Sequence, residues 1–256
     1  MQGPGLSERD LAFYRENGYL MIEDAVSPED LAELQAVARD FIDRSRRVAE
    51  SNDIYDLDEG HSPSNPRLTR IKLPHKQHPV FDRVLRSDRM KSYFTALLGP
   101  DVVLQTSKLN TKAPGGGAAV EWHQDWAFYP HTNDDLAAVG VMMDDCAIEN
   151  GPLLCVPGSH KAAFAPPADL SLQHPSVVEV PLGVGDVVIF TEALMHGTLP
   201  WRGTNQRRTL LYKYSPGSSS WSADHEPPAG PVLDGLSPRQ RLLFQKPAVH
   251  GHQPVR

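Results

Sequence analysis

A histidine and an aspartate lie two residues apart in the segment EWHQDW, residues 121–126. In a β-strand, residues i and i+2 point to the same face of the sheet. If this segment is a strand, His123 and Asp125 converge, whereas Gln124 and both tryptophans point the other way. A neutral imidazole and a carboxylate that converge supply two of the three protein ligands of a facial metal site. The segment therefore predicts a metal site that needs one further ligand.

Four further histidines follow before the C-terminal segment: His131, His160, His174 and His196. Only His196 comes just after an apolar strand-like run, DVVIF, that a Gly-Asp turn introduces. The next strand of a β-barrel would bring it back across from His123, so the layout favours His196 as the third ligand. For His160, in the turn PGSHK, we expect a structural role in which the imidazole bonds turn carbonyls. On the HxD spacing alone, a buried hydrogen-bonded pair remains the alternative for His123 and Asp125.

The elements that would position these residues lie in the second half of the chain. From residue 101, short apolar runs alternate with Pro, Gly and Asn turns: VVLQTSKLN, AVGVMMDDCA, GPLLCVP, VVEVPL, DVVIF and RTLLYKYS. This spacing is typical of an all-β sandwich or barrel and not of alternating βαβ units. The pattern predicts a β core over about residues 101–216.

The N-terminal part, residues 7–50, predicts helices. Ser7 with Asp10 three residues later resembles a capping box, and Ser27 followed by proline and two acids is a second helix start. Three further expectations complete the layout: a short strand at 18–22, a polar loop at 51–68 that is either a lid or a surface loop, and a helix at 79–98. The Pro-, Gly- and Ser-rich segment 217–256 predicts little more than one helix near 237–244.

Composition limits the class of protein. The chain has 256 residues with 40% hydrophobic content, which suits one globular domain over residues 1–256. No apolar run of about 18 residues predicts a membrane span. A net charge of -7 argues against nucleic acid or an anionic membrane as a partner. Two cysteines and the lack of a secretion signal favour a reduced, cytoplasmic protein, present as a monomer or small homo-oligomer.

The motifs taken in order resemble the phytanoyl-CoA dioxygenase family of Fe(II)- and 2-oxoglutarate-dependent oxygenases. The resemblance covers about residues 8–214 and rests on HQD, ENGPL…VPGSHK, GDVVIF, HGT and RRTLLYKYSPG, with Arg207 eleven residues after His196. It implies a mainly β fold with flanking helices, built on a double-stranded β-helix (jelly-roll, cupin-like) core. It also implies Fe(II) bound by His123, Asp125 and His196.

The implied cofactors are Fe(II), 2-oxoglutarate and O2. Two histidines and one carboxylate leave three positions of the metal open for the keto acid and O2. The implied reaction hydroxylates an unactivated C–H bond of a small organic metabolite and releases CO2 and succinate. The carboxylate at position 125 favours hydroxylation, because relatives that halogenate carry a small residue there.

The resemblance also implies residues that bind the cosubstrate. Arg207 would pair bidentately with the far carboxylate of 2-oxoglutarate, and Thr198 would give it a hydroxyl. Lys72 and Ser107 are further candidates for this site. Trp126, Phe128 and Tyr129 follow the metal segment, and as aromatics they line either the substrate pocket or the core.

Side-chain bulk and sequence spacing favour different arginines as the inward residue of the strand that carries Arg207. Alternation places Arg207, Thr209 and Lys213 on one face and Arg208 on the other, bulkier face, so bulk alone favours Arg208 as the inward residue. The spacing from His196 favours Arg207, and we follow the spacing because a cosubstrate needs smaller neighbours.

Two alternatives to hydroxylation remain at this stage. The same iron site could give desaturation, cyclisation or epimerisation. A metal-binding cupin-type protein without oxygenase activity would have no need of Arg207.

Overall fold

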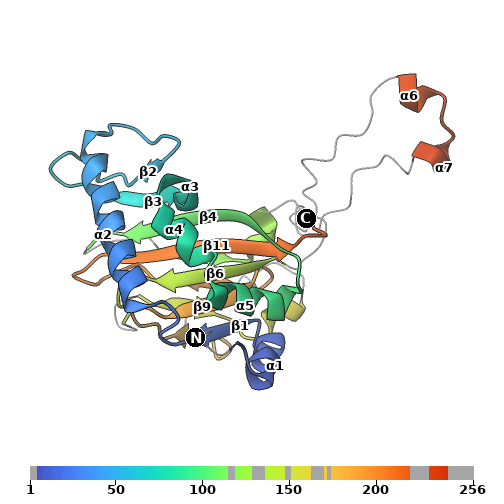
Figure 1. Cartoon of the computed structure of the whole chain (residues 1–256), viewed down its shortest axis with the longest axis horizontal. Helices are drawn as coiled ribbons and strands as arrows, with labels where there is room; N and C mark the ends of the chain where they lie inside the picture. Colours follow the sequence, from blue (N-terminus) through green and yellow to red (C-terminus); the bar gives the residue numbers. More distant parts are fainter. Residues whose placement is uncertain are drawn as a thin grey trace.

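The computed structural model describes residues 5–114, 119–128, 136–147, 151–162, 170–171, 174–219 and 231–241. Its centre is a seven-stranded antiparallel sheet in the order β1-β9-β6-β11-β4-β3-β2. The strands of this large sheet are, in chain order, β1 (Tyr19–Ile22), β2 (Tyr55–Leu57), β3 (Leu68–Lys72), β4 (Val102–Lys112), β6 (Ala137–Met142), β9 (Val187–Thr191) and β11 (Arg207–Pro216). Figure 1 shows these strands side by side, with helices from residues 28–98 in front of them.

A second, four-stranded antiparallel sheet has the order β5-β10-β7-β8. Its strands are β5 (Val120–His123), β7 (Leu153–Cys155), β8 (Val178–Val180) and β10 (His196–Thr198). From β4 to β11 the chain passes repeatedly between the large and the small sheet. This path is that of a double-stranded β-helix, so the predicted jelly-roll core is confirmed.

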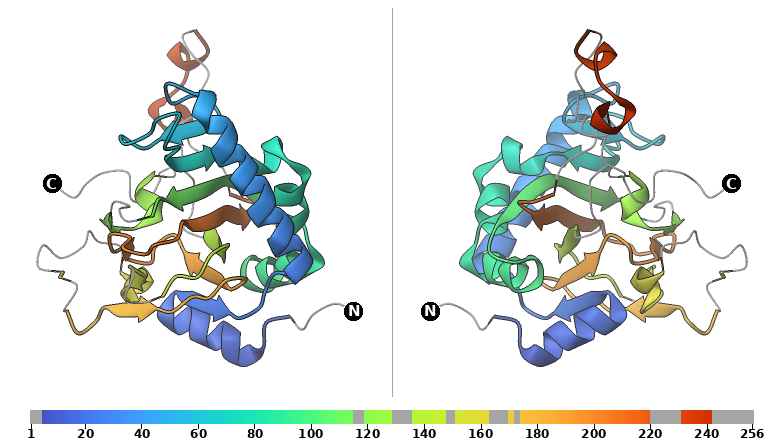
Figure 2. Two further views of the ribbon diagram at one scale, coloured as in Figure 1. Left: turned by 90° about the vertical axis from the view of Figure 1, so that its left-hand side faces the viewer. Right: turned by 90° about the vertical axis from the view of Figure 1, so that its right-hand side faces the viewer.

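Helices cover the outer face of the large sheet (Figures 1 and 2). The helical segments are α1 (Glu8–Asn17), α2 (Pro28–Arg44), η1 (Ser45–Arg47), α3 (Pro74–Gln77), α4 (Pro79–Leu85), α5 (Asp88–Leu98), η2 (Asp125–Phe128), η4 (Ser159–Lys161), α6 (Pro231–Asp234) and α7 (Pro238–Arg241). Both predicted helix starts are confirmed, since Ser7 forms a capping box with Asp10 and the Ser27 hydroxyl accepts a bond from the Asp30 amide. No helix among the described residues is long and apolar enough to cross a bilayer.

Alternation along each central strand divides its side chains between two cores. On β11, Leu210 and Tyr212 are fully buried and pack with the helices in the larger core. Residues of β6 and β9 that point the other way, such as Met142 and Phe190, pack against the small sheet in the second core. The helix layer therefore packs on one face of the central strands, and side chains on the other face point inward between the sheets. This packing holds the inward side chains in place.

Two expectations of local structure were wrong in detail. Segment 51–68 is not all loop: the Asn52 side chain accepts bonds from two following amides, and the buried Tyr55 begins β2. The expected helix at 79–98 is two helices, because the Ser87 hydroxyl caps α5. The helix expected near 237–244 is present as α7 up to Arg241, and residues 242–256 lie outside the described part.

Candidate metal centre and cosubstrate site

Three ligand-type side chains come together between the sheets. His123 ends β5 and His196 begins β10, and the two are register partners in the small sheet, with ring centroids 4.2 Å apart. Asp125 begins η2, and its Oδ1 lies 3.8 Å from His123 Nε2. One ligand atom from each residue lies within 4.8 Å of the others. The predicted triad is thus assembled, although Asp125 follows the strand instead of continuing it, so the pleat argument for its position was wrong.

The backbone orients both imidazoles in the same way. His123 Nδ1 donates to the carbonyl of Glu121 at 2.8 Å, and His196 Nδ1 donates to the carbonyl of Leu194 at 2.9 Å. A proton held on Nδ1 leaves the Nε2 lone pair free. Hydrogen bonds of this kind fix the ring orientation of metal-ligating histidines. In its neutral form, each histidine therefore presents the lone pair of Nε2 toward the site.

The charge states also suit a cation. Burial lowers the pKa of His196 to about 4, with Asp125 opposing and His123 adding to the effect, so the imidazole is neutral. Burial alone would raise the pKa of Asp125, but its interactions with Lys213, His196 and Lys108 outweigh burial and hold this pKa below its usual range. Lys213 Nζ bonds Asp125 Oδ2 directly. Two imidazoles and one carboxylate are the donor set of a facial iron site, so these residues fit Fe(II).

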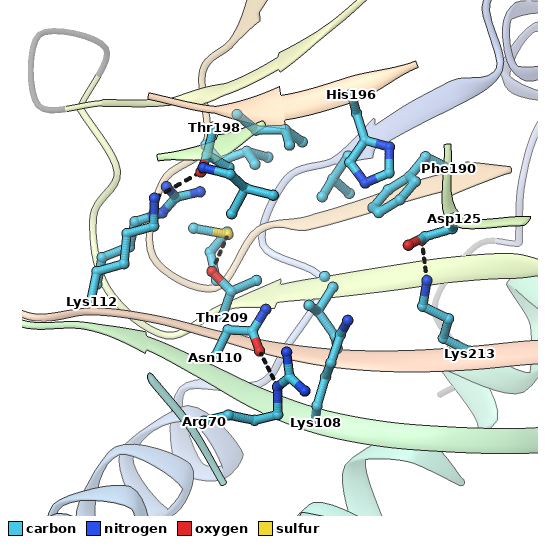
Figure 3. Close-up of a pocket in the computed structure, with 18 of the residues that line it drawn as sticks. Arg70, Lys108, Asn110, Lys112, Asp125, Phe190, His196, Thr198, Thr209 and Lys213 are labelled. Carbon is cyan, nitrogen blue, oxygen red and sulfur yellow. Dashed lines mark hydrogen bonds and ion pairs between the residues drawn. The ribbon is translucent and has the colours of Figure 1, made fainter. Parts of the chain in front are cut away.

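A cavity of about 420 Å³ extends from this triad along the inner faces of β4 and β11. Figure 3 shows His196, Asp125 and Phe190 at one end, and Thr198 with Lys112 at the other. The residues that line it include all three members of the triad and the inward side chains of both strands. A volume of this size is in the range of pockets that hold small ligands.

The far end of the cavity forms what we call the arginine end: Arg207, Lys112 and Thr198. Arg207 and Lys112 are register partners on β11 and β4, and Lys112 Nζ donates to Thr198 Oγ1 at 2.7 Å. Arg207 is 5% exposed and donates from Nη1 to the carbonyl of Gly151 at 3.1 Å. Its Nε has no hydrogen-bond partner among the described residues. Buried polar groups are rarely left unsatisfied, so this orphaned donor fits a carboxylate ligand.

Arg208 has a different environment. Its guanidinium makes a two-pronged ion pair with Asp144, at 2.7 Å from Nε and 2.5 Å from Nη2, and also bonds the carbonyl of Gln35 in α2. It does not line the cavity, whereas Arg207 does. The spacing from His196 therefore predicted the correct inward residue, and the bulk of neighbouring side chains would have predicted the wrong one.

The other residues that the sequence suggested for the cosubstrate or substrate site differ in whether they line the cavity. Thr198 and Phe128 line the cavity, and Phe128 is 65% exposed with its ring 5.7 Å from that of His123. Lys72 pairs with Asp56 at 2.7 Å and does not line the cavity. Ser107 is buried on the helix side of β4.

Three more sequence expectations concern residues around the triad. Trp126 Nε1 bonds the side chain of Gln124, and Trp126 is not among the residues that line the cavity. Tyr129 and His131 lie outside the described residues. His160 takes no part in the triad, as expected, but the carbonyl that its imidazole bonds is that of Arg15 in α1 and not one of its own turn.

The sequence analysis did not assign roles to several cationic residues of the cavity. Lys108 and Lys112 alternate with buried residues on β4, Lys213 lies on β11, and Arg70 lies on β3. In sequence they look like the solvated face of a strand. Only the knowledge that a second sheet covers this face could have identified them as cavity residues.

The fold and the site together define a non-haem iron oxygenase that uses 2-oxoglutarate. The sequence profile of the phytanoyl-CoA dioxygenase family matches residues 14–209. The chain therefore belongs to the phytanoyl-CoA dioxygenase family and is an Fe(II)- and 2-oxoglutarate-dependent dioxygenase.

Individual relatives agree with this assignment. A probable alpha-ketoglutarate-dependent hypophosphite dioxygenase of Stutzerimonas stutzeri is 32% identical over 218 residues, which cover 79% of this chain and 76% of the relative. The fold is shared with EctD from S. alaskensis with bound Fe, at a TM-score of 0.72, 23% identity and coverage of 97% and 87% of the two chains. It is also shared with the epimerase SnoN from nogalamycin biosynthesis, at a TM-score of 0.67, 19% identity and coverage of 97% and 94%.

Proposed function

We propose that His123, Asp125 and His196 bind the Fe(II) of this dioxygenase, and that the arginine end binds the far carboxylate of 2-oxoglutarate. The observation that carries this proposal is the layout of one cavity. It places the three ligand atoms at one end and the orphaned Nε of buried Arg207 at the other. A dicarboxylate chelated at one end needs a cation at the other, and arginine provides the bidentate match.

The reaction is the hydroxylation of an unactivated bond of a small molecule. Bound iron supplies the means of activating O2 with electrons from the decarboxylation of 2-oxoglutarate. One oxygen atom of O2 enters the substrate as a hydroxyl, the other enters succinate, and C1 of the keto acid leaves as CO2. The balanced equation is R–H + O2 + 2-oxoglutarate → R–OH + succinate + CO2.

The residues of the chain perform the binding, orienting and shielding. The carbonyls of Glu121 and Leu194 hold the two imidazoles in place, and the carboxylate of Asp125 supplies the negative charge that a divalent cation requires. Apolar side chains from β6 and β9, Met142, Val188 and Phe190, form the wall behind the site. A wall of this kind limits the access of water, which strengthens the electrostatic interactions at the site.

Two other outcomes remain as alternatives. Desaturation, cyclisation or epimerisation use the same ligands, and the fold shared with an epimerase is compatible with them. A metal-binding cupin without a keto-acid cosubstrate is less well supported, because it gives no reason to bury a guanidinium whose Nε has no partner among the described residues. We place the protein in the reducing cytoplasm, since Cys146 and Cys155 are buried free thiols. We also infer that it is a monomer or a small homo-oligomer.

A direct test uses the colour of the assembled site. Anaerobic addition of Fe(II) and 2-oxoglutarate should give a weak violet charge-transfer band in the wild-type protein. His123→Ala and His196→Ala should abolish this band and greatly weaken iron binding, because a facial site cannot lose one of three ligands. His160→Ala is the control and should retain both. Wild-type iron content in either ligand variant would reject the assignment of the metal site.

A second variant tests the carboxylate ligand. Asp125→Gly should abolish hydroxylation, because the carboxylate balances the Fe(II) charge and occupies a coordination position. Substantial alcohol formation by this variant would show that Asp125 is not a ligand.

A further inference from the structure

The cavity carries a marked excess of positive charge. Among the described residues, five basic side chains line it, Arg70, Lys108, Lys112, Arg207 and Lys213, and Asp125 is the one acidic side chain. The whole chain, by contrast, has a net charge of -7. Fe(II) and the dianion 2-oxoglutarate carry opposite and equal formal charges, so binding both leaves this excess unchanged. Among the described residues, this surplus favours the binding of another anion.

Three of the five cations belong to the arginine end or contact the triad: Arg207 and Lys112 form part of the arginine end, and Lys213 is bonded to Asp125. The other two are Lys108, which has no partner among the described residues, and Arg70, which lies 3.7 Å from Asp56. Asn110 lies beside them on β4. We call these three residues the lysine site. Arg70 and Asn110 are register partners on β3 and β4, with Arg70 Nε 3.4 Å from Asn110 Oδ1.

Lys108 is the central member of the lysine site. It makes no hydrogen bond or ion pair with any of the described residues, although it points into the cavity between β3 and β11 (Figure 3). Burial, with the charges of Lys213 and Arg70 adding to it and Asp125 opposing it, lowers its pKa to about 8. A partly buried ammonium group without a partner is unfavourable, and an anion bound beside it removes that penalty. Arg70 is more exposed, and its other neighbour is Asp56 at 3.7 Å.

The lysine site is separate from the arginine end. Lys108 and Lys112 are four residues apart on one face of β4, which corresponds to about 13 Å along the strand. In register, Lys112 lies opposite Arg207, whereas Lys108 lies opposite Leu211, next to the part of β11 that carries Lys213. Lys213 contacts Asp125, so the lysine site lies toward the metal end of the cavity. An anion held there would be close to the oxidising centre while the far carboxylate of 2-oxoglutarate occupies the other end.

We propose that Lys108, assisted by Arg70 and Asn110, binds an anionic group of the substrate, and that this substrate is a small phosphorus oxyanion. The inference rests on the proposed function and specifies its substrate class. A cavity of about 420 Å³ that also holds 2-oxoglutarate has space for a small second molecule. The 32% identical relative named as a probable hypophosphite dioxygenase supports phosphorus over carbon as the centre of the oxyanion. The reaction converts a P–H bond to P–OH, or a C–H bond next to the phosphorus to C–OH, by the equation given above.

The test measures binding separately from turnover. Calorimetric titrations are made on the anaerobic protein loaded with Fe(II) and 2-oxoglutarate. The probes are hypophosphite, methylphosphonate, propanoate and the neutral dimethyl sulfone. Hypophosphite or methylphosphonate should bind most tightly, and the same compound should stimulate succinate release in air. Preferred binding of propanoate or dimethyl sulfone, or no binding of either phosphorus compound, would overturn the substrate class.

Variants then test the residue. Lys108→Met should weaken binding of the phosphorus oxyanion at least tenfold while the 2-oxoglutarate affinity, read from the violet band, stays within twofold. Lys108→Arg keeps the charge and should retain binding within a few-fold, which guards against a folding defect. Lys91→Met, an exposed lysine on α5, is the matched control and should bind like the wild type.

The outcomes separate the two proposals. Equal loss of 2-oxoglutarate binding in Lys108→Met would place Lys108 in the cosubstrate site and overturn this inference while leaving the proposed function intact. Unchanged oxyanion binding in that variant would also overturn it. Absence of the violet band from the wild-type protein would reject the proposed function instead.

Discussion

Arg207 and Arg208 are adjacent in sequence and each is 5% exposed, yet their surroundings give them different roles. Arg208 is fully paired with Asp144 and with the backbone of α2, so it ties β11 to the helix layer. Arg207 points into the cavity with an unpartnered Nε. At the scale of the residue, the difference between a structural and a ligand-binding arginine is whether the protein itself satisfies the guanidinium.

Substituting each arginine should therefore have opposite consequences. Arg207→Ala should weaken 2-oxoglutarate binding by on the order of 2 to 5 kcal/mol, at least tens-fold, because a charge-assisted bidentate contact is lost. Iron binding should be spared. Anaerobic titration of the violet band with 2-oxoglutarate measures this effect.

Arg208→Ala is the matched comparison. It leaves the carboxylate of Asp144, whose side chain is 13% exposed, without its partner and should lower the free energy of unfolding by about 3 kcal/mol, with little change in 2-oxoglutarate affinity. Urea denaturation measures the stability. The reverse ranking of the two variants in the titration would overturn the assignment of Arg207 to the cosubstrate.

At the scale of the element, the metal site depends on how closely β5 and β10 approach. Gly197 follows the proposed ligand His196, and a Cβ at this position would meet the carbonyl oxygen of Val120 on β5 at 2.8 Å. That oxygen belongs to the backbone and cannot move without displacing the strand. The glycine is therefore a condition for bringing His123 and His196 together.

Gly197→Ala should weaken iron binding at least tenfold although no ligand is changed, because β5 must move away from β10. Gly235→Ala, at a position where a Cβ meets nothing within 4 Å, is the control and should bind iron like the wild type. Titration with Fe(II) in the presence of 2-oxoglutarate checks both. Wild-type iron affinity in Gly197→Ala would show that the two strands tolerate a larger separation.

Some elements of the fold and of the site could be predicted from the sequence, and others could not. A β core over the second half of the chain and the helix starts at Ser7 and Ser27 could be predicted, because strand periodicity and capping chemistry are local signals. The jelly-roll topology and the grouping of the triad came from the resemblance of the ordered motifs to a known family. The position of Asp125 on η2 could not be predicted, since the chain leaves the strand after His123. Lys72 was misplaced and Lys108 was missed for a related reason. Which face of β3 or β4 is enclosed depends on the second sheet, which comes from distant parts of the chain.

At the scale of the whole molecule, an acidic protein encloses a basic interior. Burial, with Lys213 and Arg70 adding to it, lowers the pKa of Lys108 to about 8, and burial with Arg207 does the same for Lys112. In the unfolded chain both groups return to 10.5. Below pH 8 both states hold the protons and the penalty of burying the charges is fully present. Between about pH 8 and 10.5 the unfolded chain binds more protons, so these lysines make stability increase with pH.

The double variant Lys108→Met/Lys112→Met should remove this increase. The wild-type protein should gain on the order of 1 to 2 kcal/mol per lysine, after allowance for partial exposure, relative to the variant between pH 7.5 and 9.5. Urea denaturation with chelator present and without 2-oxoglutarate measures it. Parallel pH curves for the two proteins would show that neither lysine carries a lowered pKa.

The spacing of Lys108 and Lys112 on one strand has a consequence for how such an enzyme diversifies. Under the proposals above, the groups that hold the cosubstrate and the groups that select the substrate occupy different positions of the same rigid scaffold. Mutation at positions 70, 108 and 110 can then alter what is oxidised while the oxidising apparatus is inherited intact. For protein engineering, a small library that varies these three positions can be screened for new substrates while the metal and cosubstrate sites stay unchanged.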